Sequence, residues 1–137
     1  MLIWADRAWF LMPLSRGASG SLFGYSLACR DQNGDLRDDL LVGAPTANGN
    51  GLAQSGAVFL YQGGPNGLGT TPVWSAGGGQ ANEAFGYSIA MGDMDGDTRA
   101  DIMLGAPYHN SPTQNLGGIG IENGSCVNVQ SVRYSPQ

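Results

Sequence analysis

Two short stretches rich in aspartate contain the residue types and the spacing that could bind a metal ion. They span 31–39 and 93–101, and together they hold eight of the eleven acidic residues of the chain. Carboxylates this close in sequence repel one another unless a cation neutralises them. Calcium takes about six to eight oxygen ligands in a flexible arrangement, so alternating aspartates in a tight loop suit it. The sequence therefore predicts two calcium-binding loops.

The expected ligands occupy the same positions in both loops. Side chains at positions 1, 3, 5 and 9 supply oxygens, and the backbone carbonyl of an arginine does so at position 7. The predicted ligands are Asp31, Asn33, Asp35, Arg37 and Asp39 in the first loop, and Asp93, Asp95, Asp97, Arg99 and Asp101 in the second. The second loop has one more carboxylate and is expected to bind its ion more tightly. Each ion would act as a structural staple between two strands.

Other interpretations fit the two loops less well. An EF-hand needs glycine at position 6 and a bidentate glutamate at position 12, whereas this chain has Leu36 or Thr98 and then Val42 or Leu104. Magnesium keeps several waters and rarely uses a cage made only of protein. Zinc lacks its usual ligands, because the only histidine, His109, has no partner at metal-binding spacing. Polar turns remain the alternative, although a turn needs only one or two such residues.

The two acidic stretches belong to a longer repeat with an offset of 62 residues. Residues 23–45 align with 85–107 without a gap, and 13 of the 23 aligned positions are identical. The identical positions include Phe-Gly-Tyr-Ser at the start, most of the acidic loop and Gly-Ala-Pro at the end. Such internal similarity predicts a repeat architecture.

Short strands are the elements expected to hold these loops. Glycine occurs 23 times, only 12% of residues are charged, and lysine is absent, which favours short strands and tight turns over long helices. Alternating or continuous apolar runs predict four strands in the first unit, at Tyr25–Ala28, Leu40–Val42, Ala57–Tyr61 and Pro72–Trp74. Four short antiparallel strands per unit are typical of a propeller blade, so the predicted fold class is all-β.

The motif FG…D-x-[DN]-G-D-x-R-x-D…GAP, present twice in register, resembles the FG-GAP repeat of integrin α-subunit propellers. The stretch 67–86 is similar to bacterial members of that family, and the resemblance covers roughly 21–118. It implies a partial β-propeller of about two four-stranded blades whose hairpin loops bind calcium. It also implies an extracellular or cell-surface protein with a protein or matrix ligand.

The expected organisation follows from the limits of the repeat. Residues 1–19 are predicted to be an irregular N-terminal segment, 20–81 repeat 1, 82–122 an incomplete repeat 2, and 123–137 an irregular tail. Propellers close with about four to eight blades, so further blades are expected from a longer parent chain or from other copies. No transmembrane segment is expected, because the apolar run Ala8–Leu14 is too short to span a bilayer. No convincing signal peptide is expected either, because Asp6 offsets Arg7 where a basic region is needed and no clear cleavage site follows.

The expected function is that of a non-enzymatic binding or adhesion scaffold. No Ser/His/Asp set, reactive cysteine group or phosphate-binding glycine loop is present in the sequence. The six basic residues are scattered arginines, which excludes a basic footprint for nucleic acid. Two alternatives stay open. One is an accessory propeller domain of a secreted hydrolase, such as a phospholipase or a polysaccharide-active enzyme. The other is a carbohydrate-binding module that uses Trp74 and the tyrosines.

The repeated aromatic residues are expected to form the core between the blades. They are Phe23 and Phe85, Tyr25 and Tyr87, and Trp74.

The two cysteines give two alternatives. Cys29 aligns with Met91 of the second copy, which predicts a small buried side chain, and a disulfide with Cys126 is the other alternative.

Overall fold

The computed structural model describes residues 19–111, 114–115, 118–122 and 130–132, and the following account is confined to them. The expectations for the N-terminal run Ala8–Leu14 and for Cys126 fall outside these residues. The described chain is all-β, as predicted, with one short 3-10 turn at Gly49–Gly51. No helix among the described residues is long and apolar enough to cross a membrane.

The first sheet has four antiparallel strands: β1 (Ser26–Arg30), β2 (Asp39–Ala44), β3 (Ala57–Tyr61) and β6 (Trp74–Gly77). Their order is β1-β2-β3-β6, so strands that follow one another in the chain mostly pair directly. β2 lies in the interior of the sheet, and its residues 41–44 are an unbroken run of buried small or apolar residues, as is expected of a strand covered on both faces.

The last strand of this sheet begins later than the sequence suggested. We expected it at Pro72–Trp74, but the ladder starts at Trp74, which pairs with Leu60. Val73 donates its N–H to the carbonyl oxygen of Leu60 at 2.8 Å. Proline has no N–H with which to extend this pairing, so Pro72 lies outside the strand.

The second sheet repeats this arrangement. Its strands are β7 (Ser88–Gly92), β8 (Asp101–Ala106), β11 (Gly118–Glu122) and β12 (Gln130–Val132), in the order β12-β11-β8-β7. β12 pairs antiparallel with β11. It lies inside the stretch 123–137 that we expected to be irregular, so that expectation is wrong for these three residues. The pairing with β11 defines this strand, and no motif in the sequence marked it.

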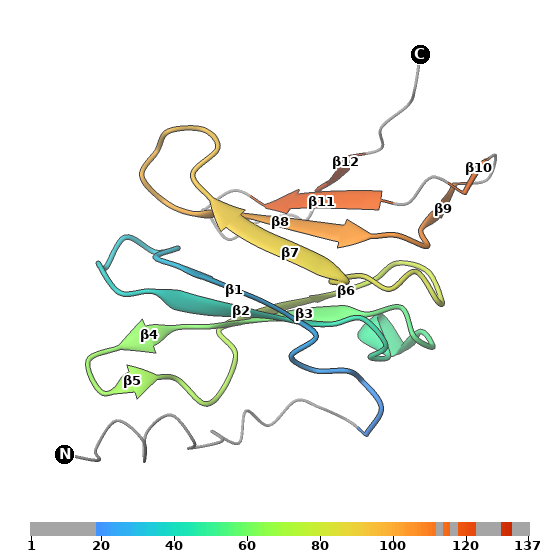
Figure 1. The fold of residues 1–137 in the computed structure, drawn as a ribbon, viewed down its shortest axis with the longest axis horizontal. Coiled ribbons are helices and arrows are strands. Elements are labelled where there is room, and N and C mark those ends of the chain that lie inside the picture. The colour runs from blue at the N-terminus through green and yellow to red at the C-terminus, as the bar shows by residue number, and fades with distance from the viewer. Residues whose placement is uncertain (1–18, 112–113, 116–117, 123–129, 133–137) are drawn as a thin grey trace.

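Two short hairpins extend from the connections between the main strands. β4 (Gly63–Gly64) and β5 (Gly67–Leu68) pair in the connection between β3 and β6. β9 (Asn110–Ser111) and β10 (Gln114–Asn115) pair in the connection between β8 and β11. Each therefore lies at the margin of one of the two larger sheets (Figure 1).

The two large sheets pack face to face, with β1 and β7 side by side (Figure 1). Between them lies one cluster of buried apolar residues: Leu41, Val58, Leu60, Phe85, Ile102, Leu104 and Ala106. Trp74 packs against this cluster, and Phe85 is 8% exposed within it, so both are core residues as predicted. Burial of this apolar surface is the main force that holds the sheets together.

Three of the predicted core residues are instead exposed. Tyr25 and Tyr87 are 51% and 42% exposed, and their ring centroids lie 4.9 Å apart. Cys29 is also exposed, which corrects the expectation of a small buried side chain. Cys29 lies in the edge strand β1, where the pleat turns alternate side chains away from the core. Tyr25 and Tyr87 directly precede the edge strands β1 and β7, and their rings pack against each other outside the core.

The repeated Gly-Ala-Pro and Phe-Gly motifs meet at the junction of the two sheets. The hydroxyl group of Ser26 donates a hydrogen bond to the carbonyl oxygen of Gly86 at 2.7 Å. A Cβ atom on Gly43 would collide with that same carbonyl and with the Ser26 hydroxyl. Gly86 has a positive φ of 81° and is itself too close to Val58 for a side chain. These glycines therefore permit the close approach of the two sheets.

The change Gly43→Ala should lower the free energy of unfolding by about 1–3 kcal/mol, the usual cost of overpacking a well-packed site. Urea denaturation followed by circular dichroism measures this difference. Gly79→Ala is the matched control, because nothing lies within 4 Å of a Cβ atom at that position. An equal effect of the two changes would show that the close approach at Gly43 is unimportant.

Candidate metal centre

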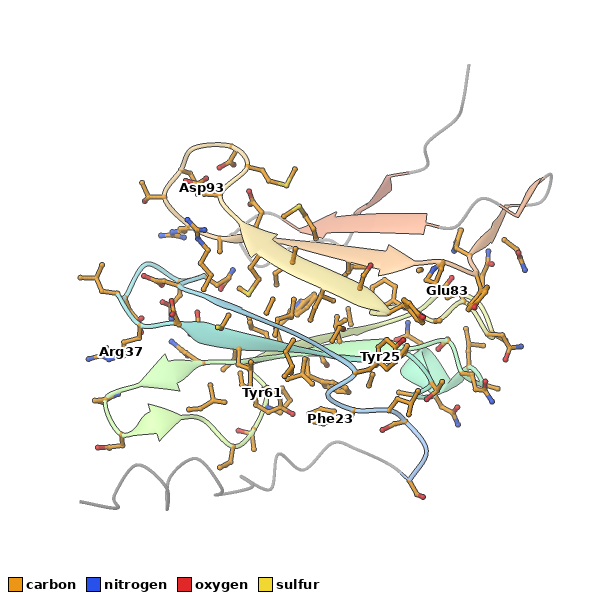
Figure 2. The ribbon with its side chains drawn as sticks, viewed as in Figure 1. Phe23, Tyr25, Arg37, Tyr61, Glu83 and Asp93 are labelled. Atoms are coloured by element: carbon orange, nitrogen blue, oxygen red, sulfur yellow. The ribbon has the colours of Figure 1, made fainter. Side chains whose placement is uncertain are left out.

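Each predicted metal loop connects two paired strands. The first links β1 to β2, and the second links β7 to β8. Both loops project from the same end of the molecule, where Figure 2 shows Asp93 and Arg37. Position 9 of each loop is the first residue of the following strand, Asp39 in β2 and Asp101 in β8. The strand pairing thus fixes position 9, while positions 1 to 7 depend on the fold of the loop.

The first aspartate organises the backbone of its own loop. Asp31 Oδ1 accepts hydrogen bonds from the N–H groups of Gly34 and Asp35 at 2.7 and 3.2 Å, and Oδ2 accepts one from Leu36 at 2.8 Å. Desolvation raises the pKa of Asp31, but hydrogen bonds from the N–H groups of Leu36, Gly34, Asp35 and Asn33 together lower it below its usual value. Asp31 is therefore held in the charged form that a cation needs.

The second loop has the same network. Asp93 accepts hydrogen bonds from Gly96 at 2.7 Å, Asp97 at 3.1 Å and Thr98 at 2.9 Å. Positions 4 and 6 of both loops have positive φ, with Leu36 at 68° and Thr98 at 75°. The backbone at position 6 thus adopts the conformation that favours glycine, although neither residue is one. Position 6 therefore does not separate these loops from an EF-hand. The difference lies at position 12, where an EF-hand has a glutamate and this chain has Val42 or Leu104 inside a strand.

Three carboxylates of the second loop converge. One oxygen from each of Asp93, Asp95 and Asp101 lies within 4.8 Å of the other two. Within the described residues this group does not include Asp97, whose Oδ1 accepts a hydrogen bond from the N–H of Arg99 at 2.8 Å. The aligned residues of the first loop include Asn33 in place of Asp95. The first loop accordingly carries less negative charge at this centre.

The carboxylate at position 9 is the most deeply buried acidic side chain of each loop. Asp39 is 2% exposed and Asp101 is 1% exposed. Asp39 Oδ2 accepts a hydrogen bond from Gln32 at 3.0 Å, and its Oδ1 accepts one from Gly63 at 2.9 Å. Asp101 Oδ2 accepts a hydrogen bond from Met94 at 2.7 Å, but its Oδ1 is buried without a partner among the described residues.

The buried Oδ1 of Asp101 indicates whether the second loop suits a cation. A buried carboxylate oxygen without a partner is costly. Here it belongs to a group of three convergent carboxylates, and all the donor atoms are hard oxygens. Such a set fits a hard divalent cation and offers neither the nitrogen nor the sulfur ligands typical of zinc. The residues present therefore fit the expected ion.

A backbone hydrogen bond joins the two loops. The N–H of Ala100 donates to the carbonyl oxygen of Asp31 at 3.3 Å. Ala100 is 1% exposed and stands where the first copy has the exposed Asp38. An aspartate at position 100 would bury an unpaired charge against the first loop, so the small apolar residue suits this contact. The two loops are therefore in direct contact.

Comparison with known proteins agrees with the repeats found in the sequence. The FG-GAP repeat model matches residues 23–61 and 85–120. Human integrin alpha-IIb is 44% identical over 95 residues, which cover 64% of this chain and 9% of the integrin. Human integrin alpha-7 is 36% identical over an alignment of 149 positions, gaps included, which covers 95% of this chain and 12% of the integrin.

A third relative is an enzyme by name. Mouse phosphatidylinositol-glycan-specific phospholipase D is 33% identical over 87 residues, which cover 63% of this chain and 10% of the phospholipase. The chain thus spans about a tenth of the length of these curated relatives. The two matches to the family model together cover more than half of the chain, at the two structural units described above. The chain therefore belongs to the FG-GAP repeat family, and its two sheets are blades of the β-propeller fold of that family.

Proposed function

We propose that this chain is a calcium-binding, integrin-α-like propeller fragment that acts as an extracellular or cell-surface binding scaffold without catalytic activity. The observation that carries the proposal is the convergence of Asp93, Asp95 and Asp101, with an unpartnered buried oxygen on Asp101. Similarity to integrin alpha chains supports the adhesion role. The repeats would span 20–81 and 82–122, and further blades would come from a longer parent chain or from other copies.

The proposed ligands are those at positions 1, 3, 5, 7 and 9 of each loop. In the first loop they are Asp31, Asn33, Asp35, the Arg37 carbonyl and Asp39, and in the second they are Asp93, Asp95, Asp97, the Arg99 carbonyl and Asp101. Bound calcium supplies positive charge that offsets the repulsion among the carboxylates. The chain's own contribution is to anchor position 9 in a strand and to shape the loop around position 1. The loop is thereby tied to both strands of its hairpin.

The opposite end of the blades is the proposed recognition face. The connections 45–56 and 78–87 and the residues 107–111 leave the strands at the end away from the acidic loops (Figure 1). In this arrangement calcium stabilises the blades without touching a protein or matrix ligand. Loops on a rigid scaffold are the usual place for recognition residues.

The change Asp101→Asn tests the proposed site, because it keeps the shape of the side chain while removing its charge. Isothermal titration calorimetry should give two calcium ions per wild-type chain. In the variant, the affinity of one site should fall on the order of tenfold or more, the range measured when a charged partner is lost from a buried site.

Two further variants, a control and a second ligand change, show whether a loss of calcium affinity is specific to the proposed ligands. Asp38→Asn is the matched control, since Asp38 is an exposed acidic residue of the first loop that is not a proposed ligand. Asp95→Asn changes an exposed residue of the acidic group and should reproduce the loss with little effect on folding. Full affinity at both sites in Asp95→Asn and Asp101→Asn would contradict the proposal.

An accessory domain of a secreted hydrolase is the second candidate. The similarity to a phosphatidylinositol-glycan-specific phospholipase D favours it. The coding sequence on either side of this chain separates the two candidates. A hydrolase domain there would support the accessory role, whereas continuing FG-GAP repeats that lead into integrin-like segments would support the adhesion role.

A further inference from the structure

An uncharged pocket of about 540 Å³ lies between the two blades, at the end away from the acidic loops. Its lining includes the prolines of both Gly-Ala-Pro motifs, Pro45 and Pro107, together with Tyr108 and three amide residues. The volume is within the range of about 300–1,000 Å³ that is typical of small-molecule sites. None of its described lining residues is charged, although the chain carries a net charge of −5.

The three amide residues are Gln54, Asn82 and Asn110, and they come from three different connections. Their side chains make no hydrogen bond within the part of the chain that the structure describes, but their backbones are held. Asn82 donates its N–H to Ala53 at 2.9 Å, and Asn110 donates its N–H to the Gln80 side chain at 2.9 Å. The pocket therefore presents free amide groups on a fixed backbone.

Two of these residues have strained backbones. The φ values of Gln54 and Asn82 are 48° and 61°, in the left-handed region. Ala84, which also lines the pocket, has a φ of 57°. Such conformations cost on the order of 1–3 kcal/mol each and gather at binding sites, where the surroundings over-determine them. Three left-handed residues in one pocket indicate that the surrounding fold holds the pocket in a defined shape.

Tyr108 provides the aromatic surface of the pocket. Its side chain is 63% exposed, although a tyrosine ring is large enough to pack well in an interior. Its backbone is fixed, because its N–H donates to the carbonyl oxygen of Glu83 at 3.2 Å. An exposed ring on a fixed backbone is suited to packing against the C–H face of a ligand.

A short contact between Glu83 and His109, the neighbours of Asn82 and Tyr108 in the chain, ties together two of the connections that line the pocket. Glu83 is 2% exposed, and its Oε2 lies 2.6 Å from His109 Nδ1 (Figure 2 labels Glu83). Its Oε1 accepts a hydrogen bond from Gly79 at 2.6 Å. The pair joins the connection before β7 to the connection after β8, 26 residues later. Sequence spacing could not reveal it, because the two side chains meet only when the loops are folded.

We propose that this pocket binds a neutral saccharide. One pyranose ring would pack on Tyr108, and its hydroxyl groups would bond to the amides of Asn82, Asn110 and Gln54. An amide both donates and accepts hydrogen bonds, as a hydroxyl group does, whereas a charged ligand would find no opposite charge here. The inference rests on the proposed role of the chain as a binding scaffold, and it names the ligand class for one part of the recognition face.

Saturation-transfer difference NMR with the full chain in saturating calcium tests this assignment. The probes are lactose, cellotriose, maltotriose and mannotriose, with a hyaluronan tetrasaccharide as the anionic comparison. We expect at least one neutral probe to bind with a dissociation constant in the millimolar range or below. Tyr108→Ala and Asn82→Ala should each weaken this binding on the order of tenfold. Tyr25→Ala, which removes an exposed ring outside the pocket lining, is the matched control.

Three other outcomes would contradict the proposed saccharide site. Absence of binding to all four neutral probes at about 10 mM, a preference for hyaluronan, or equal binding by wild type and Tyr108→Ala would overturn the saccharide site. Calcium stabilisation measured on the same samples separates this failure from a failure of the proposed scaffold. His109→Gln should weaken saccharide binding without changing calcium affinity, because it loosens only the loops that position the pocket.

Discussion

Removal of calcium should lower the melting temperature of this chain by roughly 15 °C. A ligand present at about 100 times its dissociation constant contributes about 2.7 kcal/mol per site, so two sites contribute roughly 5 kcal/mol. Each kcal/mol shifts the melting temperature of a domain of this size by about 3 °C. Differential scanning calorimetry in about 10 mM calcium, and then in excess chelator, measures the change. Added calcium should restore the original value.

The controls for this experiment separate site binding from general ionic effects. Magnesium at the same concentration should restore little of the lost stability, because it prefers a small octahedral shell that retains several waters. Sodium chloride at matched ionic strength should also fail, since screening weakens the repulsion between carboxylates without linking them. An unchanged melting temperature in chelator would refute both calcium sites at once.

The change Phe85→Ala should lower the free energy of unfolding by about 3–5 kcal/mol, the usual cost of truncating a buried phenylalanine. Phe85 lies between the two blades within the main core cluster. Its N–H donates to the carbonyl oxygen of Ser55 at 2.9 Å, so its backbone is also tied to the first blade. Removal of the ring would leave a cavity where the blades meet.

The equivalent residue of the first repeat provides the control. Phe23 is only half-buried, and its ring lies 5.6 Å from that of Phe59 within the first blade. Phe23→Ala should therefore cost about half as much or less, although both residues begin the same motif. Urea denaturation of the two variants measures the difference. Equal costs would mean that Phe85 contributes nothing specific to the contact between blades.

Local spacing explains why so much of the fold was predictable. Strand pairs such as β1 with β2 are joined by short loops, and the pattern of apolar residues sets their register. Because the sequence repeats after 62 residues, the strands predicted for the first sheet also predicted those of the second sheet. The prediction was wrong at Pro72, where the missing N–H delays the strand, and at β12, for which the sequence contains no repeat motif.

The exposed residues show what local patterns leave undecided. Tyr25, Tyr87 and Cys29 are residue types that are common in a core, but Cys29 lies in an edge strand and the two tyrosines lie immediately before edge strands. Whether a face of an edge strand is covered depends on which element packs against it, and that element is far away in the sequence. The expectation of burial therefore failed for them, while it succeeded for Phe85, which lies between the sheets.

The sequence by itself determined the repeat, the strands and the positions of the acidic residues, because these features depend on residues within a few positions of one another. Only the tertiary structure decided that Asp93, Asp95 and Asp101 converge while Asp97 bonds within its loop. It also decided that Glu83 meets His109 across 26 residues. Such contacts depend on how the fold brings connections from different strands together. The spacing of residues along the chain does not specify that arrangement.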